Sequence, residues 1–352
     1  MPYADGYAAI CLEAPPRVPR TEFSATMHWD LMKTVTGIDV DYDSPPEIKN
    51  AAAKKFMIAW NYDFNWNILI GKSVFDRLRT NMGHANYMAG DVDFDDKITN
   101  PIKSTEDVLA FDFFETYGEK NPQTLKEDFE NHYNNSRENY PEQVNMTGVY
   151  VTCMSGLIEI FGWDMLLLAA GEDPDRFGEM TNRYAGWIMQ YFDSLARADV
   201  PVVMVHDDIV WTEGAFIHPD WYRKFIFPNY KKYFTPLIES GKKIIFTSDG
   251  NYTEFIDDIA GCGVHGFVLE PLTDMNYIAE KYGRTHVFIG NADTRVLLYG
   301  NRDDIYAEVK RCMDIGKKYP GYFMAVGNHI PPNTPVDSCL FYNEAYEKSS
   351  RR

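Results

Sequence analysis

The 352-residue sequence has few cysteines, no basic run and no long uncharged hydrophobic stretch. Its five cysteines are scattered and form no CxxC pair, which argues against a disulfide framework and against a thiolate-rich zinc site. The most apolar stretch, residues 154–172, is interrupted by Glu159 and Asp164, so no membrane span is expected. The N-terminus lacks the pattern of a signal peptide. These absences predict a cytoplasmic protein with reduced thiols.

The negative net charge argues against two classes of partner. The formal net charge is −18, and no basic segment alternates with aromatic residues. Nucleic acids and anionic membranes bind through Lys and Arg, so both are poor partners for this chain.

The second half of the sequence alternates between short apolar runs and amphipathic segments. Between the runs lie helical patterns that end at glycine, as at Gly283. Three successive strand–helix–strand units require a parallel sheet with right-handed crossovers. The length suits one barrel of ~250 residues with insertions, so we predict a single α/β domain, a TIM (β/α)8 barrel spanning 1–352. The predicted strands of this half cover 200–208, 241–250, 264–271, 285–293 and 321–332.

The first half is less regular. Residues 173–198 predict a long amphipathic helix, and 147–153 a strand. Residues 54–64 are the candidate first strand. Residues 65–145 are polar, aromatic and poorly periodic, and we interpret them as long insertions around one or two strands. Residues 1–50 are expected to form an N-terminal extension of short helices that covers one end of the barrel.

Polar residues follow the strands of the second half, where barrel enzymes carry their catalytic groups. They combine carboxylates, carboxamides and imidazoles, which suits a divalent metal site or an acid–base site. In chain order they are His206, Asp207, Asp208, Asp249, Glu270, Asn291, Asp293, Asn328 and His329.

Each of these residues also has an ordinary structural explanation. A carboxylate after a strand is often the N-cap of the next helix, which applies equally to Asp208 and Asp249. Glu270 is followed directly by Pro271, which disfavours a capping role, and His329 precedes two prolines that fix its backbone. The aromatic run at 60–66 is typical of a core, although it could wall an aromatic pocket.

Four segments of the second half together resemble the uroporphyrinogen decarboxylase superfamily. The resemblance covers about 140–352 and implies the barrel fold. The Arg-rich N-terminal signature of the decarboxylases is absent, since the nearest region, RTNMGHANYMAGD, has one arginine. The segments are HDDIVWTEGAFIHPDWYRKFIFPNYKKYF, GKKIIFTSDGN, VFIGNADTRVLLYGNRDDIYAEVKRC and YFMAVGNHIPPNTPVDS.

The corrinoid-dependent methyltransferases of the superfamily offer a second comparison. Their thiol-methylating members hold zinc with a His-x-Cys-Gly after strand five and a cysteine after strand eight. Here those positions are Thr247–Gly250 and Gly327–His329, without cysteine. Oxygen and imidazole ligands leave a harder ion that prefers an oxygen substrate. The resemblance therefore implies an O-demethylase type of methyltransferase, which moves a methyl group from an aryl methyl ether to a corrinoid protein.

This resemblance gives a set of expected site residues. Asp249, Glu270 and His329 are the predicted zinc ligands, and Asp293, Glu308 and His329 are a rival set. His206 and Asp208 are the predicted catalytic residues. The predicted substrate-binding residues are Asn291, Asn328, His84 and Trp60.

Two other functions are compatible with the sequence. One is a metal-free decarboxylase or lyase on the same barrel, and the other is a corrinoid- or tetrapyrrole-binding protein without catalysis. The expected partners of the methyltransferase are a corrinoid protein and a small methoxylated aromatic. A homodimer is compatible with the sequence, which does not fix the oligomeric state.

Overall fold

A parallel sheet forms most of the central barrel in the computed structural model, which describes residues 2–76, 78–81, 86–87, 92–93 and 99–352. Six strands pair in the order β12-β11-β10-β9-β6-β5, and each pair is parallel. They are β5 (Thr147–Val149), β6 (Val202–His206), β9 (Lys243–Thr247), β10 (Gly266–Val268), β11 (Val287–Ile289) and β12 (Tyr322–Phe323). Every strand of the second half that the sequence predicts is present, with shorter bounds.

Segments of the first half close the ring. β1 (Phe64–Asn65) pairs in parallel with β4 (Val144–Asn145), which lies two residues before β5. Ile70 forms a parallel bridge with Val149. On the other edge, Arg20 forms a parallel bridge with Met324, just beyond β12. The predicted (β/α)8 barrel is therefore confirmed.

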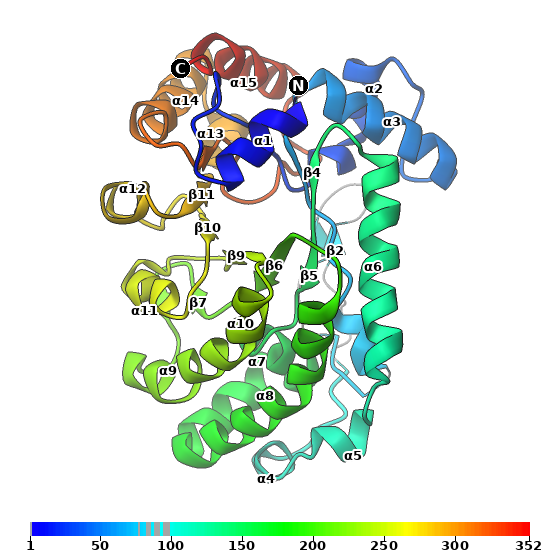
Figure 1. Ribbon diagram of the computed structural model, residues 1–352, viewed down its shortest axis with the longest axis vertical. Helices are drawn as coiled ribbons and strands as arrows, with labels where there is room; N and C mark the ends of the chain where they lie inside the picture. The colour runs from blue at the N-terminus through cyan, green and yellow to red at the C-terminus, as the bar shows by residue number, and fades with distance from the viewer. Residues whose placement is uncertain (1, 77, 82–85, 88–91, 94–98) are drawn as a thin grey trace.

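The helices that follow the strands surround the barrel (Figure 1). The hydrophobic faces of these helices pack on the outside of the sheet, as their buried residues show. In chain order they are α7 (Met154–Glu172), α8 (Pro174–Arg197), α9 (Pro219–Phe225), α10 (Phe227–Glu239), η3 (Thr253–Phe255), α11 (Ile256–Gly261), α12 (Met275–Tyr282), α13 (Thr294–Tyr299), α14 (Arg302–Gly316) and α15 (Val336–Ser349). A short hairpin, β7 (Val210–Trp211) and β8 (Gly214–Ala215), follows β6.

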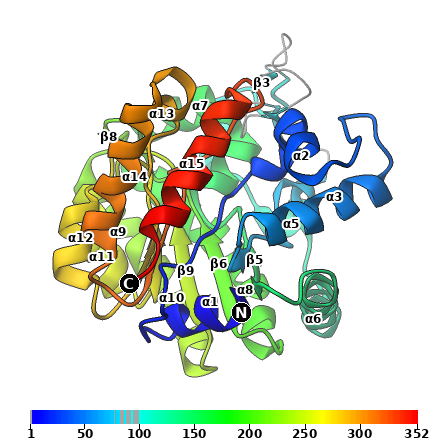
Figure 2. The same ribbon diagram turned by 90° about the horizontal axis from the view of Figure 1, so that it is seen from above.

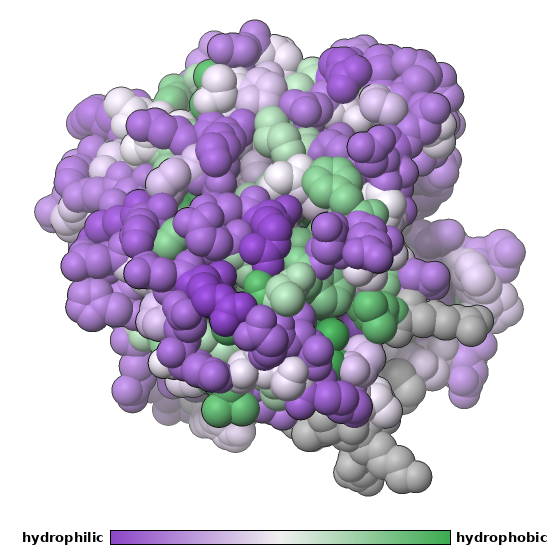
Figure 3. Space-filling model, turned by 90° about the horizontal axis from the view of Figure 1, so that it is seen from below, coloured by the Kyte–Doolittle hydropathy of each residue, from purple (hydrophilic) through white to green (hydrophobic). Residues whose placement is uncertain are grey.

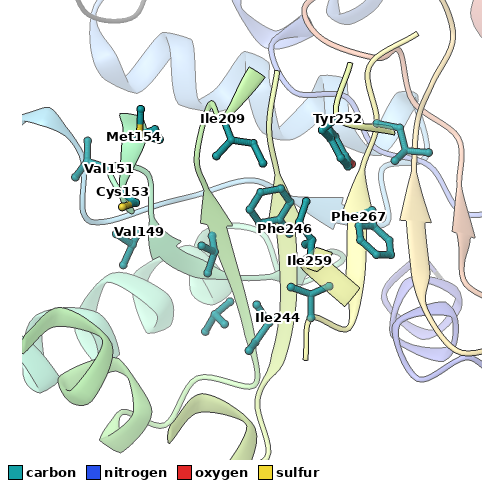
Figure 4. Packing of buried hydrophobic residues seen from close by; sticks show 14 of the residues in the cluster. Val149, Val151, Cys153, Met154, Ile209, Ile244, Phe246, Tyr252, Ile259 and Phe267 are labelled. Carbon is teal, nitrogen blue, oxygen red and sulfur yellow. The ribbon is translucent and has the colours of Figure 1, made fainter. Parts of the chain in front are cut away.

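Two apolar layers hold the barrel together. The outer layer lies between strands and helices and includes Val149, Phe246 and Phe267 (Figure 4). The inner layer fills the barrel with side chains such as Met204 and Ile245. Residues alternate between the layers because successive side chains of a strand point to opposite faces.

The N-terminal segment covers one end of the barrel. Helix α1 (Pro2–Ile10) contributes Ala9 and Ile10 to the inner layer. The two termini lie on the same side of the molecule (Figure 2), and Arg17 forms an antiparallel bridge with Arg351. The N-terminal region also contains η1 (Ala25–Met27), α2 (Trp29–Thr36) and α3 (Pro46–Ala59), so the expected short helices are present.

The prediction of a first strand over 54–64 is wrong. Residues 46–59 form α3, and of the predicted segment only Phe64 belongs to a strand. Pro46 suits the first turn of a helix, and the chain leaves the helix at Trp60. The first barrel segment is instead the stretch around Arg20, whose single bridge gives it no clear strand signature.

The insertions of the first half are mainly helical. They include a long helix, α6, which lies along the side of the barrel (Figure 1). Asn121 caps α6 by accepting hydrogen bonds from the backbone N–H groups of Gln123 and Thr124. The elements are η2 (Lys72–Phe75), β2 (Asn86–Tyr87), β3 (Val92–Asp93), α4 (Thr105–Leu109), α5 (Phe113–Tyr117) and α6 (Pro122–Asn139).

Among the described residues one helix, α7, is long and apolar enough to cross a membrane by length and composition. Within its apolar window, 67% of the residues are buried inside the protein, and the backbone leaves helical geometry at Gly162 with φ 70°. A core helix of a globular protein passes the same test, and the packing of α7 against α4 and α8 is of that kind. The surface seen in Figure 3 is mostly hydrophilic, with hydrophobic residues gathered in a smaller area.

Candidate active site

At the end of β6, two neighbouring carboxylates, Asp207 and Asp208, point to opposite faces of the sheet, because successive side chains alternate. Asp207 points into the outer layer, is fully buried, and accepts hydrogen bonds from Ser155 N–H at 2.7 Å and Tyr230 O–H at 2.5 Å. Burial raises the pKa of Asp207. Its role is to tie the strand to α7 and α10. The side chains of His206 and Asp208, one residue before and one residue after, point toward the barrel opening.

In the part of the chain that the structure describes, His206, Asp208 and Asp249 form a group of side chains that could hold a metal ion. One ligand atom from each lies within 4.8 Å of the others. His206 Nε2 is 3.1 Å from Asp208 Oδ1, which also accepts a hydrogen bond of 3.0 Å from the backbone N–H of Asp249. The register of β6 and β9 causes this meeting, because it pairs His206 with Thr247 and so brings the following residues together.

The hydrogen bonds of His206 assign its protonation. Its Nδ1 lies 3.0 Å from the carbonyl oxygen of Tyr150, which can only accept, so Nδ1 carries the proton. The ring also stacks on Tyr150, with centroids 3.7 Å apart and planes 5° apart. In the neutral imidazole Nε2 is therefore an acceptor, and it faces a carboxylate oxygen, another acceptor. A proton or a metal cation between them removes this conflict.

Glu270, a predicted zinc ligand, lies outside that group of three. One carboxylate oxygen accepts a 2.7 Å hydrogen bond from the backbone N–H of Gly250, and the other accepts a hydrogen bond from the Asn328 side chain. Burial, and secondarily the charge of Asp208, raise the pKa of Glu270, and the two hydrogen bonds oppose that rise. The side chain therefore braces the loops after β9 and β12 against each other.

His329, the other predicted ligand, lines the cavity at the barrel opening together with Asp249 and His206. Its ring contacts Phe23 edge to face, with centroids 5.2 Å apart. Burial lowers the pKa of His329 to about 4, so the imidazole is neutral at neutral pH. Asn328 lines the same cavity, as its predicted substrate-binding role requires.

The cavity measures about 40 Å³ and has an aromatic wall. Phe23, Trp66 and Tyr150 face the polar groups of the strand ends, and Val268 and Ile289 close the apolar side. Among the described residues that line it, none is Lys or Arg. The cavity thus combines an electronegative rim with a wall suited to a flat apolar group.

The remaining predicted residues lie elsewhere. Asn291 is buried and donates to the carbonyl oxygens of Glu270 and Thr273, which places it behind the site as a structural link. Trp60 packs on Phe56 at 4.6 Å and under the Arg20 guanidinium in the core, and it is not among the residues that line the cavity. His84 lies outside the described residues.

The two carboxylates of the rival ligand set, Asp293 and Glu308, already have other partners. Asp293 caps α13 and forms an ion pair with Arg295 at 2.7 Å. Glu308 lies close by, because it accepts a hydrogen bond from Asp293 N–H and pairs with Arg311 at 2.7 Å. Helix α14 thus brings Glu308 next to the residue that caps α13. Each carboxylate of this pair has a basic partner.

The sequence analysis considered the aromatic run at 60–66 as a pocket wall, but it selected Trp60 from that run and missed Phe23. Trp66 belongs to the aromatic run at 60–66, but the predicted residue was Trp60, which ends α3. The sequence feature that could have indicated Trp66 is its position directly after β1, since other site residues also follow strands. Phe23 follows Arg20, the first barrel segment, in the same way.

A family model now identifies the chain. The model described as uroporphyrinogen decarboxylase (URO-D) matches residues 94–348, most of the barrel. The chain belongs to the uroporphyrinogen decarboxylase family. It is therefore an enzyme of that superfamily, as the resemblance in the sequence implied.

Individual relatives are distant. The chain is similar to the uroporphyrinogen decarboxylase of Geobacter sulfurreducens, with 23% identity over 179 residues, 51% of each chain. It is similar to that of Syntrophotalea carbinolica, with 25% identity over 168 residues, 48% of this chain and 47% of the relative. The chain thus spans about half the length of the curated relatives it matches.

Similarity of structure extends over the whole chain. A methyltransferase from Methanosarcina mazei matches with a TM-score of 0.65 and 17% identity, covering 99% of this chain and 98% of that one. At this identity the match establishes the shared fold.

Proposed function

We propose that the chain is a methyltransferase that moves a methyl group from a methoxylated aromatic to the cobalt of a separate corrinoid protein. The observation that carries the proposal is the group of His206, Asp208 and Asp249, because His206 and Asp249 line one cavity together with aromatic residues. Nitrogen and carboxylate oxygen donors suit a hard Lewis acid that acts on an oxygen atom. The match to a methyltransferase fold of full length supports the same reaction class.

A zinc ion fits this donor set. Nε2 of His206 is an acceptor because Nδ1 donates to Tyr150, and Asp208 and Asp249 supply oxygens within 4.8 Å. Three protein ligands with a remaining open position are typical of catalytic zinc. When bound, zinc would supply Lewis acidity to the ether oxygen of the substrate.

This ligand set differs from the one that the sequence suggested. Asp249 is common to both, whereas His206 and Asp208 replace Glu270 and His329. Glu270 lies outside the group of three, and its two oxygens accept hydrogen bonds from Gly250 N–H and Asn328, so Glu270 holds the loop of Asp249 in place. His329 is a neutral imidazole against Phe23, placed to contact the substrate.

The residues of the chain position the methyl ether for displacement. Phe23 and Trp66 would hold the aromatic ring, and Asn328 and His329, which line the same cavity, would contact its oxygen. The methyl–oxygen bond breaks and its electron pair stays on the aryl oxygen, while reduced cobalt of the partner supplies the pair for the new bond to carbon. The product oxygen then takes a proton from solvent.

The lining of the cavity distinguishes this reaction from decarboxylation of a porphyrinogen. That substrate carries many carboxylates, and none of the described residues that line the cavity is Lys or Arg. Arg20, in the first barrel segment, is fully buried and paired with Glu22 at 3.1 Å. A polyanion would lack counter-charges here.

Metal content and turnover test the proposal together. Zinc-loaded protein, a panel of methoxyarenes and chemically reduced cobalamin should yield methylcobalamin and the free phenol. Asp208→Asn should lose the bound zinc and lower turnover by about 10³-fold, because it removes a ligand. Failure to form methylcobalamin across the panel would exclude the proposed function.

Two matched variants separate the three ligand sets. Glu270→Gln removes a charge of the same kind and should keep zinc, and Asp293→Asn should keep both zinc and turnover. Loss of zinc in Glu270→Gln with retention in Asp208→Asn would return the site to Asp249, Glu270 and His329. Loss in Asp293→Asn alone would assign it to Asp293, Glu308 and His329. Activity that survives chelation, with no metal bound, would favour a metal-free decarboxylase or lyase.

A further inference from the structure

Ser155, the second residue of α7, contacts two of the three proposed zinc ligands. Its Oγ accepts a hydrogen bond of 2.7 Å from the backbone N–H of Asp208 and lies 3.4 Å from Nδ1 of His206. The residue is fully buried, and it is not among the residues that line the cavity. One hydroxyl therefore reaches both ligands at the end of β6 from behind the site.

This hydroxyl takes over where the backbone pairing of β6 with β9 ends. The last pair in the register is His206 with Thr247, and the N–H of Asp207 still donates to the Thr247 carbonyl at 2.9 Å. The next N–H along the chain, that of Asp208, donates to Ser155 Oγ instead. The contact fixes the backbone of Asp208, and with it the place from which the carboxylate extends.

Asp207 holds Ser155 in place in return. Its Oδ1 accepts hydrogen bonds from the backbone N–H groups of Ser155 at 2.7 Å and of Cys153 at 3.2 Å. These bonds tie the first turn of α7 to the end of β6. The Ser155 hydroxyl thus has a defined position relative to both ligands before any ion binds.

The contact with His206 favours the tautomer that a metal ion needs. Nδ1 donates to the carbonyl oxygen of Tyr150 at 3.0 Å, and Ser155 Oγ is a second acceptor beside it. Two acceptors around Nδ1 keep the proton there and leave Nε2, which lies 3.1 Å from Asp208 Oδ1, to act as a ligand atom.

We propose that Ser155 is a positioning residue of the metal site, whose hydroxyl sets the geometry of Asp208 and of the His206 imidazole. This inference rests on the proposed function, because it concerns the ion which that function requires. Removal of the hydroxyl leaves the buried N–H of Asp208 without this acceptor and lets the carboxylate move. Such outer partners of metal ligands typically contribute about 10–100-fold to metal affinity.

Titration of the metal-free protein with Co²⁺, a coloured substitute for zinc, tests the proposal without turnover. Ser155→Ala should raise the Kd for Co²⁺ by about 10–100-fold and alter the visible absorption of the bound ion, because the ligands no longer hold one geometry. With zinc and a methoxyarene, kcat should fall while KM stays within about twofold, since Ser155 lies outside the cavity. Ser155→Thr keeps the hydroxyl and should restore the affinity.

Ser194→Ala is the matched control. Ser194 is also a fully buried serine on a helix, α8, and its hydroxyl donates to the carbonyl oxygen of Gln190 at 2.8 Å. This variant should leave the Kd for Co²⁺ and the absorption spectrum unchanged. Thermal denaturation checks that each variant is folded, and the two alanine variants decide the case if Ser155→Thr is not. An unchanged Kd in Ser155→Ala, or an equal change in the control, would overturn the positioning role.

The outcomes separate this inference from the proposed function. If no methoxyarene transfers its methyl group but Ser155→Ala still weakens Co²⁺ binding, the proposed function fails and the positioning role stands. If methyl transfer occurs and Ser155→Ala binds Co²⁺ like the unmodified protein, the positioning role fails and the function stands. If the unmodified protein binds neither Co²⁺ nor zinc, both fail.

Discussion

The two halves of the chain contribute different things to the site. The second half supplies the ionisable groups, His206, Asp208 and Asp249, which follow regular buried strands. The first half supplies the aromatic wall, Phe23 and Trp66, from segments with little regular structure. Under the proposed function, the groups for chemistry and the groups for substrate fit come from separate stretches of sequence.

This division explains the pattern of similarity. The family model matches residues 94–348, which include the ionisable groups, and Phe23 and Trp66 fall outside that range. The family match therefore covers the barrel and the polar residues at its opening. Of the three aromatic residues of the wall, Tyr150 lies within the matched range, and Phe23 and Trp66 lie in the part of the chain that the match does not cover.

The largest expected effect comes from a pair of variants, one in each half of the chain. His206→Ala should lower kcat by about 10³-fold and abolish zinc binding, because it removes a ligand and leaves Asp208 without its partner. Phe23→Leu should raise KM for a methoxyarene by about tenfold and leave kcat within a few-fold, because it removes aromatic contact with the ring.

Steady-state kinetics with one donor measure both variants, and elemental analysis measures the zinc. Equal losses of kcat in the two variants would show that the halves do not have separate roles. Normal zinc content in His206→Ala would remove His206 from the ligand set.

The second prediction concerns stability in the first half. Arg20 is fully buried with its guanidinium against Trp60 at 4.4 Å, and it pairs with buried Glu22. Arg20→Met should lower the free energy of unfolding by about 3 kcal/mol, because it leaves a buried carboxylate without its cation. Chemical denaturation measures the change.

Lys33→Met is the matched control, since it breaks an ion pair with Asp39 that is 51% and 93% exposed. An exposed pair contributes about 0–1 kcal/mol, so this variant should be nearly neutral. A loss for Arg20→Met no larger than that of the control would mean that this pair does not anchor the first barrel segment.

The smallest expected effect lies at the opposite end of β10 from Glu270. Burial lowers the pKa of His265 to about 4, and its Nδ1 accepts a hydrogen bond from Ile244 N–H at 3.2 Å. The unfolded chain takes up this proton near pH 6.5, whereas the folded protein does so only near pH 4. Stability is therefore retained above pH 6.5 and declines as the pH falls from 6.5 to 4.

His265→Asn should make the decline of Tm over that pH interval shallower than in the unmodified protein. Its carboxamide oxygen still accepts from Ile244 N–H, so the change isolates the titration. His218→Asn, at a side chain that is 77% exposed, is the control for loss of one imidazole. An unchanged slope for His265→Asn would show that other groups determine acid sensitivity.

Much of the fold follows from local patterns. β-Branched runs between glycines and polar turns predict β9, β10 and β11, because a buried parallel strand is apolar on both faces. The helix over Pro174–Arg197 follows from its amphipathic pattern. The strand prediction at 54–64 fails because a short apolar segment fits a helix equally well. Here Pro46, in the first turn of α3, favours the helix.

The sequence by itself determined which polar residues end the strands, because that depends on alternation and turn chemistry over a few residues. Only the tertiary structure decided that Asp249 meets His206 and Asp208 and that Glu270 turns to Gly250 and Asn328. The register between β6 and β9 and the closure of the barrel set those distances. Both depend on contacts between residues far apart in the chain, which no local pattern records.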